Sequence, residues 1–156
     1  MQFVAFRCRY LMNYSNFAPM KKRRLLKYIL CAPAFLYSGA LLLLILFLTL
    51  SPDITGGSTM KLFPHADKAV HFLMFGALAA ALTFDIFRRR DSIRFGLVIL
   101  CGIVSSLIGG LVEILQEAMR LGRSGDVWDF LADCCGAFVF ALISGYICNK
   151  CLYISL

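Results

Sequence analysis

Two histidines, an aspartate and a lysine stand together in the stretch HADKAVHF at residues 65–72, at the start of an apolar run. Imidazole and carboxylate groups are the side chains that most often move protons in enzymes. On a helix, Asp67 and His71 are four residues apart and share one face. The stretch therefore indicates a polar site with Asp67, Lys68 and His71 as candidate residues, whereas His65 is expected in a solvated loop.

Two later stretches repeat this placement of polar residues at helical spacing. In the first, polar residues stand three, four and seven positions apart: Glu113, Gln116, Glu117 and Arg120. In the second, acids stand three and seven positions apart: Asp126, Asp129 and Asp133. Such spacings place side chains on one helix face, so each helix presents a polar stripe. Arg123 lies in the connection between the two stripes.

Four apolar runs must position these residues, and their length indicates a membrane. The chain of 156 residues is 60% hydrophobic, which exceeds the usual share in a soluble domain of this size. A helix needs about 20 residues to cross a hydrocarbon core of about 30 Å. The runs predict spans at residues 28–50, 67–87, 94–116 and 127–148. The predicted fold is all-α: a polytopic membrane bundle of four transmembrane helices, forming one domain over residues 28–150.

Basic residues are concentrated on one side of the predicted membrane. Of the 16 lysines and arginines, 12 fall in residues 7–27, residues 88–94 and Lys150. The positive-inside rule makes this side cytoplasmic, with both termini inside and residues 51–66 and 117–126 outside. Residues 1–27 form a basic cytoplasmic segment in which Met20 is a candidate start. The net charge of +7 therefore reflects membrane topology, and no nucleic-acid partner is predicted.

The three polar stretches are expected to meet at one height in the bundle. At a rise of about 1.5 Å per residue, Asp67, Glu113 and Asp133 each lie about 26–32 Å from the basic residue at the other end of the helix. Small residues at four-residue spacing would let the third and fourth helices approach closely. These are Gly102, Ser106 and Gly110 on the third helix, and Ala137, Ala141 and Gly145 on the fourth. The expected result is a tight bundle with an outward-facing polar pocket.

Structural roles are open alternatives for several of these residues. Asp126 has the position of a helix N-cap, a role that short acidic side chains often fill. Lys68 is placed to extend its ammonium group to lipid headgroups. Glu113 and Asp133 have a structural alternative too, because pairing with Arg120 or Arg123 would lock the helices together. Ionisable groups inside a membrane are nonetheless more often functional than not.

The cysteines and histidines do not form a recognised metal or redox motif. Five of the seven cysteines lie inside predicted spans, where they act as small apolar residues. The pair C-N-K-C at residues 148–151 has no second pair, which makes a metal or redox role weak. His65, Asp67, His71 and Glu113 supply ligand types without a compact signature such as H-E-x-x-H. No metal or other cofactor is predicted.

Three sequence blocks, DKAVHFLMFG, EILQE and RSGDVWDFLADCCGA, resemble the signature blocks of VanZ-like membrane proteins of bacteria. Those blocks have the form D-K-x-x-H-F, E-x-x-Q, and R followed by D-x-x-x-N-x-x-G, and the resemblance covers about residues 35–148. It departs at Asp133, where an asparagine is common in the family. The resemblance marks these residues as functional: Asp67, Lys68, His71, Phe72, Glu113, Gln116, Arg123, Asp129 and Gly136.

The resemblance implies a multi-pass protein of the bacterial inner membrane, in a family named for a member associated with teicoplanin resistance. Two functions are expected from it and from the pocket. In the first, the pocket binds or modifies an envelope lipid or another amphipathic molecule and lowers susceptibility to glycopeptides. In the second, the chain is an enzyme that acts on a phosphate-bearing lipid or cell-wall precursor. His71 or Glu113 would then be the general base, and Arg123 would hold the anionic group. The oligomeric state is left open.

Overall fold

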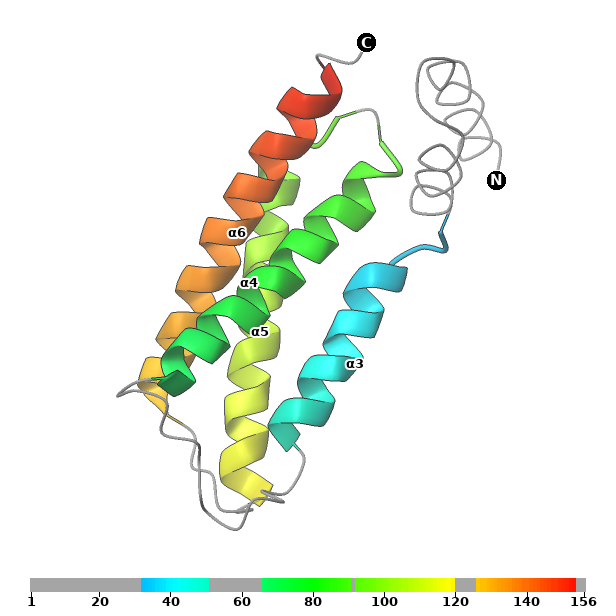
Figure 1. The fold of residues 1–156 in the computed structure, drawn as a ribbon. Coiled ribbons are helices and arrows are strands. Elements are labelled where there is room, and N and C mark those ends of the chain that lie inside the picture. The colour runs from blue at the N-terminus through cyan, green and yellow to red at the C-terminus, as the bar shows by residue number, and fades with distance from the viewer. Residues whose placement is uncertain (1–31, 51–65, 91, 120–125, 154–156) are drawn as a thin grey trace.

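Four antiparallel helices make up the described part of the computed structural model, which covers residues 32–50, 66–90, 92–119 and 126–153. The helices are α3 (Leu36–Leu50), α4 (Ala66–Phe87), α5 (Phe95–Met119) and α6 (Val127–Tyr153). They alternate in direction, so that the start of α3 and the end of α6 lie at the same end of the bundle (Figure 1). Within these ranges no strand occurs, and the predicted all-α class is confirmed.

Three of the four helices are long and apolar enough to cross a membrane. These spans are Asp67–Phe87, Phe95–Met119 and Val127–Lys150. Large apolar side chains cover their outer surfaces, as expected for helices that contact lipid; examples are Leu107 at 67% exposed and Ile114 at 66%. The apolar helix α3 has 15 residues, which corresponds to about 22 Å, shorter than a hydrocarbon core of about 30 Å. The chain is therefore a helical membrane protein by composition and length.

The helix boundaries differ from the predicted ones mainly at α3. The first span was expected from residue 28, but residues 32–35 are not helical and α3 begins at Leu36. Pro33 explains the late start, because proline disfavours helix in the residue before it and cannot donate a backbone hydrogen bond. Phe35 has a positive φ of 53°, a conformation incompatible with continuing a helix through it.

The other boundaries follow the prediction more closely. Helix α5 continues to Met119, so residues 117–119 of the expected loop are helical, and α6 continues to Tyr153. Several predictions concern residues that lie outside the described ranges: residues 1–27 with Met20, residues 51–65 and residues 120–125. Cys151 is helical, but its side chain is not described.

Helices α4 and α6 pack at very short distance because glycines lie at their crossing. A Cβ atom on Gly136 would overlap the backbone carbonyl of Phe72, lying 2.8 Å from its carbon atom. One turn along α4, a Cβ on Gly76 would lie 2.8 Å from the ring of Phe140. Backbone contact of this kind is the usual role of small residues between membrane helices. It fixes the relative height of α4 and α6, and with it the relative position of their polar residues.

The predicted small-residue stripes also lie at helix contacts. On α5, Gly102 faces the ring of Phe138 and Gly110 faces Phe130. On α6, Gly145 lies against Val98, and the neighbouring alanines of the stripe, Ala137 and Ala141, are buried. The expected close packing of α5 and α6 is therefore confirmed.

An ion pair between Asp85 and Arg88 is buried at the end of α4. Arg88 was counted with the basic residues of the cytoplasmic side; its side chain is 1% exposed and donates to Asp85 through Nε at 3.0 Å and Nη2 at 2.6 Å. Asp85 also accepts hydrogen bonds from the backbone N–H and the hydroxyl of Ser38 on α3, at 2.9 and 2.8 Å. Arg88 directly follows α4, at the predicted end of the span, and it joins α4 to the residues before α3; its burial was not predicted.

Candidate functional site

Three buried side chains from three helices meet at the end of the bundle opposite Arg88. His71 Nδ1 lies 3.0 Å from Asp133 Oδ1 and 3.3 Å from Glu113 Oε1. The three residues, called the His71 triad below, are 4%, 0% and 8% exposed for His71, Asp133 and Glu113. They come from α4, α6 and α5, so the predicted convergence of the three polar stretches is confirmed for them.

Gly109 on α5 has no side chain, and this makes room for the carboxylate of Asp133 on α6. A Cβ on Gly109 would lie 2.7 Å from Asp133 Oδ2, which means that the carboxylate lies directly on the α5 backbone. Gly109 was not predicted as a contact, because the predicted stripe of small residues ran through Gly102 and Gly110. A signal was present, since Gly109 is four residues before Glu113 and therefore shares its face.

A second group of charged residues forms a rim beside the triad and consists of Asp67, Lys68, Asp126 and Asp129. The Lys68 ammonium group donates to Asp126 Oδ2 at 2.6 Å and to Asp129 Oδ1 at 2.9 Å. It does not merely extend toward headgroups, because it joins α4 to the start of α6. The ammonium group also holds the pKa of the Asp126 carboxyl below its usual range.

Asp126 has the capping role that was left open, and it contacts the site as well. Its Oδ1 accepts a hydrogen bond from the backbone N–H of Trp128 at 3.0 Å, as an N-cap side chain does. Its own backbone N–H donates to Glu113 Oε2 at 3.0 Å. The cap of α6 thus orients the Glu113 carboxylate, and capping and site formation are combined in one residue.

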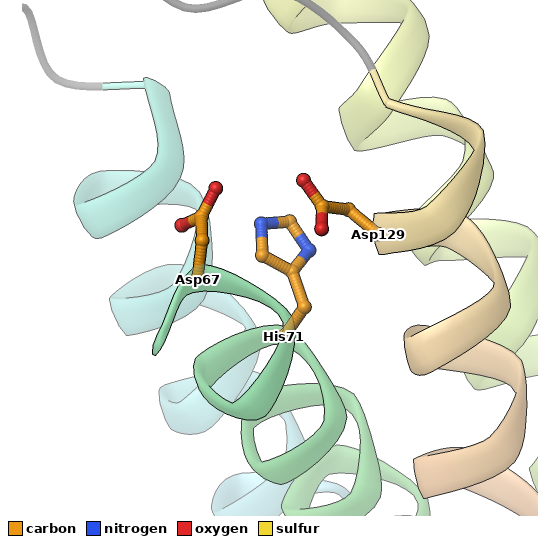
Figure 2. A group of neighbouring side chains, drawn as sticks. All are labelled: Asp67, His71 and Asp129. Carbon is orange, nitrogen blue, oxygen red and sulfur yellow. The ribbon is translucent and has the colours of Figure 1, made fainter. Parts of the chain in front are cut away.

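Asp67 lies on the exposed side of the rim. Figure 2 shows the carboxylates of Asp67 and Asp129 on opposite sides of the His71 ring. One ligand-type atom from each of these three residues lies within 4.8 Å of the other two. The predicted spacing of Asp67 and His71 on one face of α4 therefore brings a carboxylate beside the imidazole.

Gln116 was predicted as a site residue, and the structure assigns it a different contact. Its amide Nε2 donates to the backbone carbonyl of Thr49, near the end of α3, at 3.0 Å. The side chain is 7% exposed, so this bond joins α5 to α3 within the bundle. Arg123 and Arg120, the candidate arginine partners of the acids, lie outside the described residues.

The triad and rim together carry an excess of acids. Five carboxylates, from Asp67, Glu113, Asp126, Asp129 and Asp133, face one lysine and one histidine in the described residues. Two carboxylate oxygens in this group, Glu113 Oε1 and Asp133 Oδ2, are buried without a hydrogen bond from the described part of the chain. The arrangement can accept protons or bind a cationic group. It provides no serine or cysteine nucleophile among the residues that form it.

A hollow on the surface lies far from these residues, at the other end of the bundle. It has a volume of about 770 Å³ and is lined mainly by apolar side chains, among them Phe95, Val98, Leu142 and Tyr146. Its lining contains neither a histidine nor an acid. The chemistry that the side chains allow is therefore concentrated at the triad and rim.

Comparisons of the chain with protein-family models, with curated proteins and with solved structures find no match.

Proposed function

We propose that the chain is a VanZ-like protein of the bacterial inner membrane whose triad and rim bind or modify an envelope lipid or another amphipathic molecule. In this proposal four helices cross the membrane, both termini are cytoplasmic, and the triad opens to the outer side. The charges support this orientation, because five of the described basic residues lie at the end of the bundle opposite the triad: Arg88, Arg89, Arg90, Arg94 and Lys150. Lower susceptibility to glycopeptides such as teicoplanin would be one consequence.

The observation that carries the proposal is the convergence of His71, Glu113 and Asp133 from three apolar helices. Ionisable groups at membrane depth are costly, and they are retained where they serve a substrate, an ion or a partner. A purely structural role would be expected to pair each charge fully. The triad instead leaves Glu113 Oε1 and Asp133 Oδ2 without a hydrogen bond from the described residues.

The acid-rich rim indicates what kind of headgroup would be recognised. Carboxylates favour a positively charged or hydrogen-bond-donating group, while apolar helix surfaces beside them favour a hydrocarbon portion. Lipids and lipophilic glycopeptides combine both features. Exposed apolar side chains in the same turns of α4 as His71, such as Val70 and Leu73, would contact the hydrocarbon portion.

A membrane-embedded enzyme is the second candidate, and the His71–Asp133 contact favours it. A histidine held at 3.0 Å by a buried carboxylate has a fixed ring orientation, which suits a general base. The substrate would be a phosphate-bearing lipid or cell-wall precursor. Arg123 is the residue expected to hold its anionic group.

Profiling of membrane lipids and cell-wall precursors tests both candidates. Cells with the gene, without the gene, and with His71→Asn would be compared at matched protein abundance. A headgroup or precursor pool that changes only with the wild-type gene would favour the enzyme. Equal pools with altered glycopeptide binding would favour the binding protein. If pools, binding and glycopeptide susceptibility are the same in all three strains, the proposed function is wrong.

A further inference from the structure

The His71 triad contains more acceptor atoms than its one imidazole nitrogen can satisfy. A neutral imidazole Nδ1 carries at most one hydrogen, and Asp133 Oδ1 at 3.0 Å is its hydrogen-bond partner. Glu113 Oε1 lies 3.3 Å from the same nitrogen and receives no hydrogen bond within the described residues. Glu113 is 8% exposed, so bulk water does not compensate for the missing bond.

The distances in the triad match those between two ligands of one metal ion. Nitrogen and carboxylate ligands lie about 2.0–2.2 Å from Zn²⁺. At octahedral or tetrahedral angles, two such ligands are therefore about 2.8–3.6 Å apart, by the same bond lengths. The two measured separations from Nδ1 are 3.0 and 3.3 Å. The donor atoms of all three residues lie within 4.8 Å of one another.

The charges in the triad also suit a divalent ion. Lys68 pairs with Asp126 and Asp129 in the rim, and among the described residues its ammonium group forms no ion pair with Glu113 or Asp133. Two carboxylates and a neutral imidazole carry a charge of −2, which one divalent cation neutralises. Buried charges of one sign are stable only when paired or bound to a metal.

Glu113 is held in position by a hydrogen bond from outside the triad. Its second oxygen, Oε2, accepts from the backbone N–H of Asp126 at 3.0 Å, which leaves Oε1 directed toward His71. Metal-binding carboxylates commonly have such an orienting partner. The carboxylates of Asp67 and Asp129, on the two sides of the imidazole, provide further acceptors around the ring (Figure 2).

We propose that His71, Glu113 and Asp133 bind one divalent transition-metal ion, with Zn²⁺ as the first candidate. An imidazole ligand favours a transition metal over Mg²⁺ or Ca²⁺, which select oxygen ligands. Three protein ligands leave one coordination position open, as in zinc sites that bind water or a substrate group. This proposal does not depend on the function proposed above, because an ion would be held whatever molecule the pocket receives.

Metal content of the purified protein tests the proposal. The full chain, prepared in detergent without a polyhistidine tag, is equilibrated with Zn²⁺, desalted and analysed by plasma mass spectrometry. We expect one Zn²⁺ per wild-type chain. In Glu113→Gln and Asp133→Asn the affinity should fall at least about 100-fold, since losing an orienting partner alone costs about 10–100-fold. The matched control is Glu117→Gln, an exposed acid one turn further along α5, which should retain the ion.

Three further results would overturn the proposal. Wild-type protein without bound Zn²⁺, Mn²⁺ or Fe²⁺ above the detergent blank would show that no such site exists. Loss of the ion on joint Cys148→Ser and Cys151→Ser replacement, with retention in Glu113→Gln, would assign it to the cysteine pair. Loss in Asp67→Asn with retention in Glu113→Gln would move it to the rim. Size-exclusion profiles of each variant identify misfolded protein, and a wild-type chain that binds no ion overturns the proposal even where a variant fails to fold.

Discussion

Replacing Gly136 with alanine is expected to reduce the amount of folded protein sharply, because α4 and α6 touch through their backbones at this position. The added Cβ would overlap the carbonyl oxygen of Phe72, and a backbone atom cannot rotate aside as a side chain can. Overpacking usually costs about 1–3 kcal/mol. Because backbone atoms are involved here, we expect about 3 kcal/mol or more. The measurement is the thermal midpoint and the size-exclusion profile in detergent.

Gly39→Ala is the matched control for this replacement. Gly39 lies in helix α3, and an added Cβ there meets no atom within 4 Å. Alanine exceeds glycine in helix propensity by about 1 kcal/mol, so this variant should be as stable as wild type or more stable. Equal midpoints for Gly136→Ala and Gly39→Ala would contradict the close crossing of α4 and α6.

Replacing Arg88 with glutamine is expected to destabilise the bundle by about 3–5 kcal/mol, the usual result of removing one partner from a buried ion pair. Asp85, which is fully buried, would lose two charged hydrogen bonds. Arg88 also donates to the backbone carbonyls of Ala32 and Pro33 at 3.0 and 2.8 Å. These hydrogen bonds to the residues that precede α3 would be lost too. Thermal unfolding of the purified variant measures the effect.

The neighbouring Arg89 offers the matched control for Arg88. Its side chain is exposed, so Arg89→Gln should change the free energy of unfolding by less than about 0.5 kcal/mol. If both variants unfold at the same temperature, the buried network of Ser38, Asp85 and Arg88 does not hold α3 against α4.

Much of the fold could be predicted because the membrane imposes simple length rules. Apolar runs bounded by charges identified α4, α5 and α6 to within a few residues, apart from the longer C-terminal end of α6. The start of α3 was missed because the long apolar run seemed to continue through Pro33. A hydrophobic pattern depends only on the apolar side chains, and it does not include the backbone restriction that proline imposes.

The height of each polar residue could also be predicted, whereas its partners could not. Counting residues along each helix placed Asp67, Glu113 and Asp133 at one level, and the structure brings His71 together with Glu113 and Asp133. Partner choice depends on how far each helix is rotated about its axis, and that rotation is set by packing. Gln116 shares a stripe with Glu113 by spacing, yet it bonds to Thr49 on α3.

The burial of Arg88 at the boundary of its span was not predicted either. Arginines at the end of a predicted span usually lie in the aqueous loop, and the positive-inside rule counts them there. Asp85 and Arg88 are three residues apart on one helix face, which was a signal that they could pair. The structure shows that the pair is buried and that Asp85 also accepts two hydrogen bonds from Ser38 on α3.

Our central claim is that the His71 triad serves function and is not merely a lock between helices. Glu113→Gln tests it most directly, because glutamine keeps the shape of the side chain and can still accept the hydrogen bond from Asp126. Membrane abundance and growth under a lipophilic glycopeptide would be measured for this variant and for Glu117→Gln. We expect Glu113→Gln to keep near-normal abundance while susceptibility returns to that of cells without the gene, and Glu117→Gln to behave as wild type. Wild-type growth of a well-expressed Glu113→Gln variant, or loss of protein in parallel with loss of growth, would contradict the claim.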